Sequence, residues 1–282
     1  MSDSHGCLYV CATPIGNLKD ISLRCLEVLK QVDLIAAEDT RHTRKLLNYY
    51  DIGTPVTSLH EHNERRKSPI IIKKLEDGKD VALVSDAGMP GISDPGGYLI
   101  DYVLKEGYPI QVIPGPSAVT TALALSGLPM ERFAFEGFLP RVRKERVKYL
   151  QKLVKEEHTL VFYEAPHRLL STLEDLAELI PDRPIAVCRE LTKQHEEVWR
   201  GTVKDALSYF TEKGVKGELT LVLAGAAQAE PGEVPVDCDL VRGRLEELLA
   251  EGNSVKDAVR IVIEETGIRK NIAYRIATEL DK

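Results

Sequence analysis

Tryptophan and cysteine are scarce in this chain of 282 residues, which has one tryptophan and five cysteines. The cysteines are scattered and never spaced as C-x-x-C, so we expect neither a disulfide framework nor a zinc knuckle, and we predict no metal site. No apolar run is long enough to span a bilayer, and the N-terminus lacks the basic and apolar regions of a signal peptide. We therefore expect a soluble cytoplasmic protein without a membrane partner.

An excess of basic charge is also absent, because the formal net charge is -7. This balance argues against a general nucleic-acid coat protein, although it leaves room for a local basic patch. The chain is 43% hydrophobic and long enough for two domains, so it can bury a substantial core.

Two phosphate-binding fingerprints are missing. After the first predicted strand, the glycine-rich G-x-G-x-x-G turn of dinucleotide-binding folds is replaced by TPIGNL, which has the single glycine Gly16. A P-loop sequence, G-x-x-x-x-G-K-[ST], does not occur anywhere. Glu38 does follow the second predicted strand, where a ribose-binding acid would lie, so the dinucleotide alternative is weakened and stays open.

The most distinctive stretch is Leu83–Gly97, LVSDAGMPGISDPGG, in which a short apolar strand runs into four glycines, two prolines and two aspartates. Such a composition excludes a helix or a strand interior, and it predicts a shaped loop where a ligand can approach the backbone. Val10–Asn17 and Val112–Ala118 are also apolar strands that break into turns rich in proline and glycine. Three such loops at the carboxyl ends of parallel strands favour one ligand crevice over three plain turns.

The apolar periodicity predicts alternating strands and helices as far as residue 126, and therefore a largely parallel sheet with helices on its faces. Beyond residues 127–140 the predicted strands follow one another more closely, which predicts antiparallel pairing in a second α/β unit. A linker over Ala226–Asp237 and three short helical patterns complete the chain. We accordingly predict three domains, at residues 1–126, 127–228 and 229–282.

Several polar runs allow two interpretations. Glu38–His42 is either a solvated helix start or a polar wall of the active site, and His60–Glu64 favours substrate contact over metal binding because it lacks helical ligand spacing. The basic segment Arg141–Lys148 is either a phosphate-binding strip or a solvated helix. The C-terminal helices are compatible with a helix-turn-helix and also with a purely structural cap.

Seven motifs in order carry a resemblance: TPIGNL, AEDTR, SDAGMPGISDPG, PGPSA, FYEAPHR, RELTK and HEE-x-x-RG. Together they resemble the family of ribosomal RNA small subunit methyltransferase I, within the tetrapyrrole methylase-like class. The similarity runs from about Leu8 to Gly225 and extends to the C-terminal helices. The resemblance implies two α/β domains of the class III methyltransferase type, with a cofactor cleft between them and a small C-terminal helical extension.

The same resemblance implies a function. A homodimer would transfer a methyl group from S-adenosylmethionine to the ribose 2′-hydroxyl of a cytidine in the decoding region of 16S rRNA, within the small ribosomal subunit. By motif position, the implied cofactor contacts are Pro14, Ser85, Asp86, Ala87, Met89, Ser117, Ala118, Tyr163, Glu164 and Gly201.

The acceptor hydroxyl needs help to lose its proton, whereas a sulfonium is already a good electrophile. We expect the base or assisting cation among five groups at strand ends or in dense polar runs, namely Glu38, Asp39, Arg41, Lys193 and Glu196. Two alternatives remain: methylation of a tetrapyrrole precursor on the path to cobalamin or sirohaem, and a nucleotide-sensing regulator that binds DNA through its last helices. The basic segment and the extra helices favour RNA.

Overall fold

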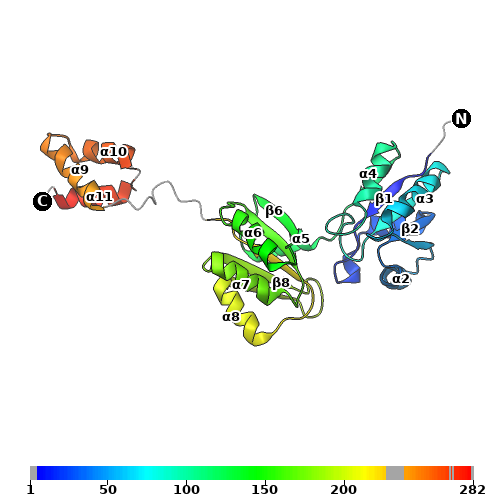
Figure 1. The fold of residues 1–282 in the computed structure, drawn as a ribbon. Helices are drawn as coiled ribbons and strands as arrows, with labels where there is room; N and C mark the ends of the chain where they lie inside the picture. The colour runs from blue at the N-terminus through cyan, green and yellow to red at the C-terminus, as the bar shows by residue number, and fades with distance from the viewer. Residues whose placement is uncertain (1–4, 227–237, 267, 269, 281–282) are drawn as a thin grey trace. The chain divides into compact units, whose positions relative to one another are not determined.

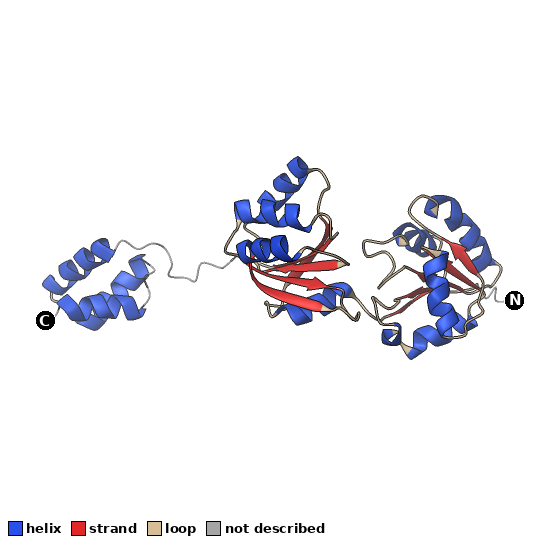
Figure 2. Ribbon diagram, turned by 90° about the horizontal axis from the view of Figure 1, so that it is seen from below, coloured by secondary structure: helices blue, strands red, loops and turns tan. Residues whose placement is uncertain are grey.

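The computed structural model describes residues 5–226, 238–266, 268 and 270–280 (Figure 1). The chain forms two compact units, residues 1–225 and 226–282. The larger unit holds two five-stranded sheets, each with helices packed against it (Figure 2). Within the described residues, none of the helices combines the length and the apolar character that crossing a bilayer requires.

The first sheet is parallel throughout and has the strand order β3-β2-β4-β1-β5. Its strands are β1 (Leu8–Cys11), β2 (Leu34–Ala37), β3 (Val56–Ser58), β4 (Val81–Val84) and β5 (Ile110–Ile113). All four residues of β4 are buried, and the strand pairs with β1 and β2 at the centre of the sheet. The strand order reverses around β1 and β4, so the loops that follow them leave the sheet at its topological switch point.

The first four α-helices bury their apolar sides against the two faces of this sheet. They are α1 (Leu23–Gln31), α2 (Thr40–Tyr49), α3 (Glu64–Glu76) and α4 (Gly97–Lys105), with a 3₁₀ turn at Leu18–Asp20 before α1. Apolar residues of α1 and α2 pack in one cluster, while those of α3 and α4 pack in another with β1 and β4. Side chains cap two of these helices, because Ser22 accepts from the Cys25 amide and Asp39 from the Arg41 amide.

The second sheet has the order β6-β7-β10-β8-β9, in which only the β6–β7 pair is parallel. Its strands are β6 (Phe133–Phe138), β7 (Thr159–Glu164), β8 (Pro184–Arg189), β9 (Glu197–Thr202) and β10 (Leu219–Leu223). The expected antiparallel pairing is therefore confirmed, and it follows the close succession of β8, β9 and β10 with a single helix among them.

Helices cover both faces of the second sheet. Apolar residues of α6 (Arg143–Leu153), α7 (Leu169–Leu179) and α8 (Val203–Lys213) share one core cluster with alternate residues of its strands. The opposite face packs against α5 (Ala118–Ser126), which follows β5 of the first sheet in the chain. The small side chains of α5 allow this close approach, and its contact with β8 and β10 brings the loop after β5 to the second sheet.

The C-terminal unit contains α9 (Cys238–Ala250), α10 (Val255–Thr266) and α11 (Lys270–Leu280), which pack on one another around their own apolar core. The expected fold class is thus confirmed: two α/β sheets followed by a helical extension. The domain boundary at residue 126 stays a prediction. The boundary at residue 228 and most of the predicted linker, residues 227–237, lie outside the described residues.

Candidate active site

The loops after β1 and β4 are joined at the switch point. The Thr13 amide donates to the Gly88 carbonyl at 2.9 Å, and the Gly88 amide donates back to the Thr13 carbonyl at 3.0 Å. The Thr13 hydroxyl adds a bond of 3.1 Å to the Ser85 carbonyl. These two loops therefore lie side by side, with their backbones directly paired.

The long loop after β4 is anchored by a buried carboxylate. Glu64 accepts hydrogen bonds from the Gly96 and Leu99 amides, both at 3.0 Å, and so satisfies amides at the start of α4. Gly96 has φ of 124°, and a Cβ there would lie 2.9 Å from Leu83 Cδ2, so no other residue fits without strain. Glu64 therefore supports the loop, although its sequence context favoured substrate contact.

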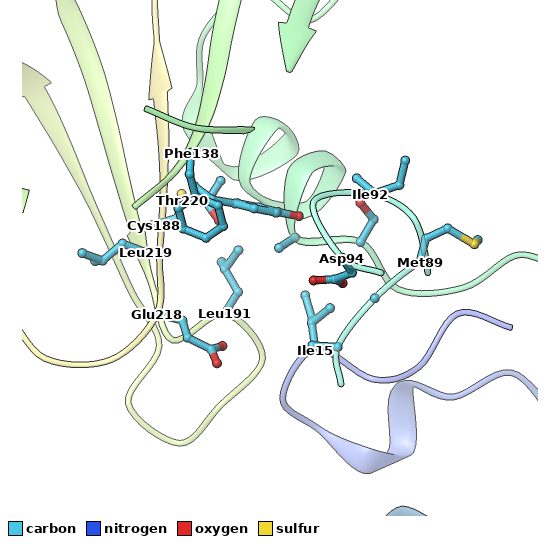
Figure 3. Close-up of a pocket in the computed structure, with 15 residues that line it drawn as sticks. Ile15, Met89, Ile92, Asp94, Phe138, Cys188, Leu191, Glu218, Leu219 and Thr220 are labelled. Carbon is cyan, nitrogen blue, oxygen red and sulfur yellow. The ribbon is translucent and has the colours of Figure 1, made fainter. Parts of the chain in front are cut away.

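A pocket of about 220 Å³ opens between the two sheets' loops (Figure 3). Its lining comprises Ile15, Ala87, Gly88, Met89, Ile92, Asp94, Ser117, Ala118, Phe138, Tyr163, Cys188, Leu191, Glu218, Leu219 and Thr220. Most of the lining is apolar, and aromatic rings come from β6 and β7. Burial raises the pKa of the Cys188 thiol to about 11, so this cysteine is neutral near pH 7 and acts as apolar lining.

Asp94 is an acidic group in this pocket, and Figure 3 shows its carboxylate pointing into the space between the loop after β4 and Leu191. Burial, reinforced by the nearby negative charge of Glu38, raises the pKa of Asp94 to about 7, although a hydrogen bond with Ser85 opposes this. Burial also raises the pKa of Glu38. Asp94 thus exchanges its proton near neutral pH, as a general base in a cleft must.

A second chamber of about 240 Å³ adjoins the pocket and shares Ile15, Ala87 and Glu218 with it. Its other lining residues are Thr13, Pro14, Gly16, Leu18, His42, Thr43, Lys45, Leu46, Ser85, Asp86 and Lys193. Gly16 allows the first loop to approach the second α/β half, because a Cβ there would lie 2.6 Å from Lys193 Cγ. The Asn17 amide also donates to the Thr192 hydroxyl at 3.0 Å, so the two halves meet at the site.

The five predicted catalytic groups are dispersed. Glu38 accepts from the Asp86 amide at 3.2 Å beside the site, and Lys193 lines the second chamber. Asp39 and Arg41 form a mutual ion pair at 2.7 Å, outside both chambers, and this pairing holds the pKa of Asp39 well below its usual range. Glu196 accepts from the Thr192 amide at 2.6 Å and so shapes a loop.

Most of the predicted cofactor contacts line one of the chambers. The 220 Å³ pocket takes Ala87, Met89, Ser117, Ala118 and Tyr163, and the second chamber takes Pro14, Ser85 and Asp86 and shares Ala87.

Two of the predicted cofactor contacts lie outside both chambers. Glu164 is buried and accepts from the Thr172 hydroxyl at 2.6 Å, and Gly201 lies on β9, where a Cβ would meet the Trp199 ring at 2.6 Å. Both positions therefore have a structural explanation.

Sequence reasoning missed several lining residues. Asp94 lies in the SDPGG end of the distinctive loop, so its acidic character beside glycines was the signal that could have found it. Leu219 and Thr220 gave no signal, because they belong to β10 and read as an ordinary buried strand.

Lys193, which was predicted, is held by Glu190 at 3.1 Å and by Glu218 at 2.8 Å, a network that only the fold assembles.

Comparison with known proteins identifies the family to which this chain belongs. Residues 7–207 match the model of the tetrapyrrole (corrin/porphyrin) methylases. Among solved structures, diphthine synthase superposes with a TM-score of 0.58 at 17% identity, covering 78% of this chain and 90% of that one. A uroporphyrin-III C-methyltransferase from Thermus thermophilus, complexed with S-adenyl homocysteine, gives a TM-score of 0.55 at 16% identity, covering 78% and 97%. At these identities the likeness concerns the fold.

Curated relatives are much more similar in sequence. Ribosomal RNA small subunit methyltransferase I from Synechocystis sp. is 47% identical over 278 residues, covering 98% of this chain and 99% of the relative. The Bacillus subtilis protein of the same name is 43% identical, covering 95% and 93%. The Thermotoga maritima protein is 51% identical, covering 78% of this chain and 99% of the relative. The chain therefore belongs to the tetrapyrrole methylase family and, within it, to the family of ribosomal RNA small subunit methyltransferase I.

Proposed function

We propose that the protein transfers a methyl group from S-adenosylmethionine to the ribose 2′-hydroxyl of a cytidine in the decoding region of 16S rRNA. The near full-length identity to rRNA methyltransferases supports rRNA as the substrate. The observation that carries a group transfer is a half-buried acid, Asp94, directed into an apolar pocket where loops of both sheets meet.

The residues of the cleft fit S-adenosylmethionine. Aromatic and aliphatic side chains around the 220 Å³ pocket suit a purine ring, among them Tyr163, Leu191 and Leu219. Negative charge at the pocket, from Asp94 in its lining and Glu38 nearby, suits a positively charged sulfur. When bound, the cofactor supplies an electrophilic methyl carbon. Ala87, Met89, Ser117, Ala118 and Tyr163 would hold it, with Pro14, Ser85 and Asp86 from the second chamber.

In this proposal Asp94 would accept the proton of the acceptor hydroxyl as the methyl group passes to that oxygen, with the bond from methyl carbon to sulfur breaking and its electron pair staying on the sulfur of S-adenosylhomocysteine. Burial, reinforced by the negative charge of Glu38, keeps the pKa of Asp94 high enough for this exchange near neutral pH. Lys193, fixed by Glu190 and Glu218, offers a cation to the acceptor oxygen or to a neighbouring phosphate. The apolar side chains of the lining would limit the water around the reactants, and the loops would hold the reactants in line.

The working assembly is a homodimer in the cytoplasm that acts on the small ribosomal subunit. The relatives' names support the subunit, while the dimer follows from the resemblance alone. The proposal also includes three domains, with boundaries at residues 126 and 228. In it, the second α/β domain completes the cofactor cleft.

The test is methyl transfer from labelled S-adenosylmethionine to small subunits that lack the modification, followed by nucleoside mass spectrometry. The proposal expects label in 2′-O-methylcytidine. Label in another nucleoside would support the use of S-adenosylmethionine but refute cytidine 2′-hydroxyl as the acceptor. Binding of S-adenosylhomocysteine without any label in RNA would refute the rRNA function and favour a small acceptor such as a tetrapyrrole precursor.

A further inference from the structure

A larger cavity of about 810 Å³ lies beside the cofactor cleft, in the second α/β half. We call it the Arg141 groove, and it is lined by Phe138, Leu139, Pro140, Arg141, Arg146, Ala165, His167, Arg168 and Ser171. Phe138 lines both this groove and the 220 Å³ pocket, so the two cavities adjoin at one side chain. Its ring is 54% exposed, and exposed aromatic rings of this kind are platforms on which unpaired bases stack.

Two arginines fix the walls of the groove. Arg168 donates to the Leu139 carbonyl at 2.7 Å and to the Pro140 carbonyl at 3.2 Å, and its guanidinium faces Glu164 at 3.3 Å. Arg146 is buried and pairs with Asp175 at 2.7 Å. Because an acid neutralises each of these arginines, their contribution is to hold the segment after β6 in place.

Arg141 lines the groove and is exposed, and α6, which begins two residues later, carries the exposed lysines Lys144 and Lys148. His167 also lines the groove and is exposed. Among the residues that the structure describes, the ion pairs of this helix involve Arg143 and Arg146, and none involves Arg141, Lys144 or Lys148.

The composition makes this cluster of free cations unusual. The chain as a whole carries a net charge of -7, and Glu145 is the acid among the exposed side chains of α6. The cations are therefore a local basic strip on an acidic protein, which is complementary to a polyanion.

We infer that the Arg141 groove binds the phosphate backbone of the rRNA strand next to the nucleotide that enters the cleft, with Phe138 stacking a neighbouring base at the junction. This inference rests on the proposed function, which supplies RNA as the substrate. A small acceptor needs no basic groove continuous with the cleft, whereas an RNA strand must lie somewhere on either side of its modified ribose. Arg141 and the exposed ring of Phe138 line one groove that shares a wall with the cleft, and the exposed lysines of α6 follow Arg141 closely in the chain.

The test compares the double variant Arg141→Ala/Lys144→Ala with the wild type in binding to unmodified small subunits over a range of salt concentrations. Each lost phosphate contact lowers the salt slope of log K by about 0.7 and weakens binding about five-fold near 0.1 M salt. The double variant should therefore bind about 25-fold more weakly, with a slope lower by about 1.4. Both side chains are exposed and unpaired, so the fold should persist, and the affinity for S-adenosylhomocysteine should stay unchanged.

Lys30→Ala is the matched control, because Lys30 is an exposed lysine on α1 of the first sheet. It should leave the affinity and the salt slope unchanged. Wild-type affinity and slope in the double variant would overturn the inference, and so would a weaker affinity with an unchanged slope, which would indicate a ribosomal protein as the occupant. A wild-type protein that binds S-adenosylhomocysteine but not subunits would refute the proposed function itself.

Discussion

Replacing Asp94 by asparagine should stabilise the folded protein above neutral pH and at the same time slow methyl transfer strongly. Burial of this carboxyl, reinforced by the negative charge of Glu38, raises its pKa to about 7. In the unfolded chain the same group ionises near pH 4. Between these two values the folded state keeps a proton that the unfolded state has lost, so this group makes stability fall as the pH rises from about 4 to about 7.

The size of the effect follows from the same shift. A carboxyl whose pKa rises from about 4 to about 7 would cost the ionised folded state roughly 4 kcal/mol in the absence of screening. Solvent reaches the open side of Asp94, which reduces the cost to roughly 1–2 kcal/mol. Asparagine has nearly the same shape and never ionises. Asp94→Asn should therefore raise the free energy of unfolding by roughly 1–2 kcal/mol at pH 8, and by less at pH 5.5.

Urea unfolding at pH 5.5 and pH 8 measures this difference, and single-turnover methyl transfer to small subunits measures the activity. Loss of a general base should reduce the rate by about 10²- to 10⁴-fold. Asp101→Asn is the control, because Asp101 is exposed and paired with Lys105 on α4, and it should change neither quantity appreciably. A less stable Asp94→Asn variant at pH 8, or one with wild-type turnover, would refute this account of the pocket.

Three further changes test other parts of the site. Glu38→Gln removes the negative charge beside Asp94, so the rising limb of the pH–rate profile should move to lower pH; complete loss of activity would instead make Glu38 the base. Glu64→Ala leaves the buried amides of Gly96 and Leu99 without acceptors, and it should cost about 2–4 kcal/mol in urea unfolding and weaken S-adenosylhomocysteine binding in calorimetry. Arg146→Ala removes a partner of the buried Asp175 and should cost about 3–5 kcal/mol in the same unfolding assay. Wild-type stability in this variant would show that the ion pair is not needed for the fold.

Some of the predicted site residues line the pocket, and others are held by hydrogen bonds to their neighbours in the chain. The Pro/Gly loops predicted a ligand crevice, and the family resemblance implied contacts within those loops at Ala87, Met89, Ser117 and Ala118. These residues line the pocket, because loops after neighbouring parallel strands must meet at one edge of a sheet. Asp39 was predicted as a catalytic group because it is polar and follows a strand end. Its side chain nevertheless pairs with Arg41 and caps α2, since local hydrogen bonds satisfied it before any ligand could.

The roles of the individual cations in the basic segment Arg141–Lys148 could not be predicted from the sequence either. Periodicity and composition identified it as either a phosphate-binding strip or a solvated helix, and its residues turn out to have different roles. Arg146 is buried against Asp175, a residue 29 positions away in the chain, while Lys144 and Lys148 remain exposed on α6. Which cation is structural and which is free depends on where α7 packs, and no spacing rule along the segment contains that information.

By itself, the sequence determined the local structure and the position of the crevice. Apolar runs that break into glycine and proline, as in Leu83–Gly97, specify buried strands and shaped loops through backbone sterics and burial, which act over a few residues. Only the tertiary structure decided that α5 packs on the second sheet, that Leu219 and Thr220 of β10 face the pocket, and that Asp94 lies in the field of Glu38. Those outcomes depend on long-range packing and on charges that folding brings together in a partly buried cleft. The strength of such interactions is set by distance and solvent exposure, which are defined only once the chain has folded.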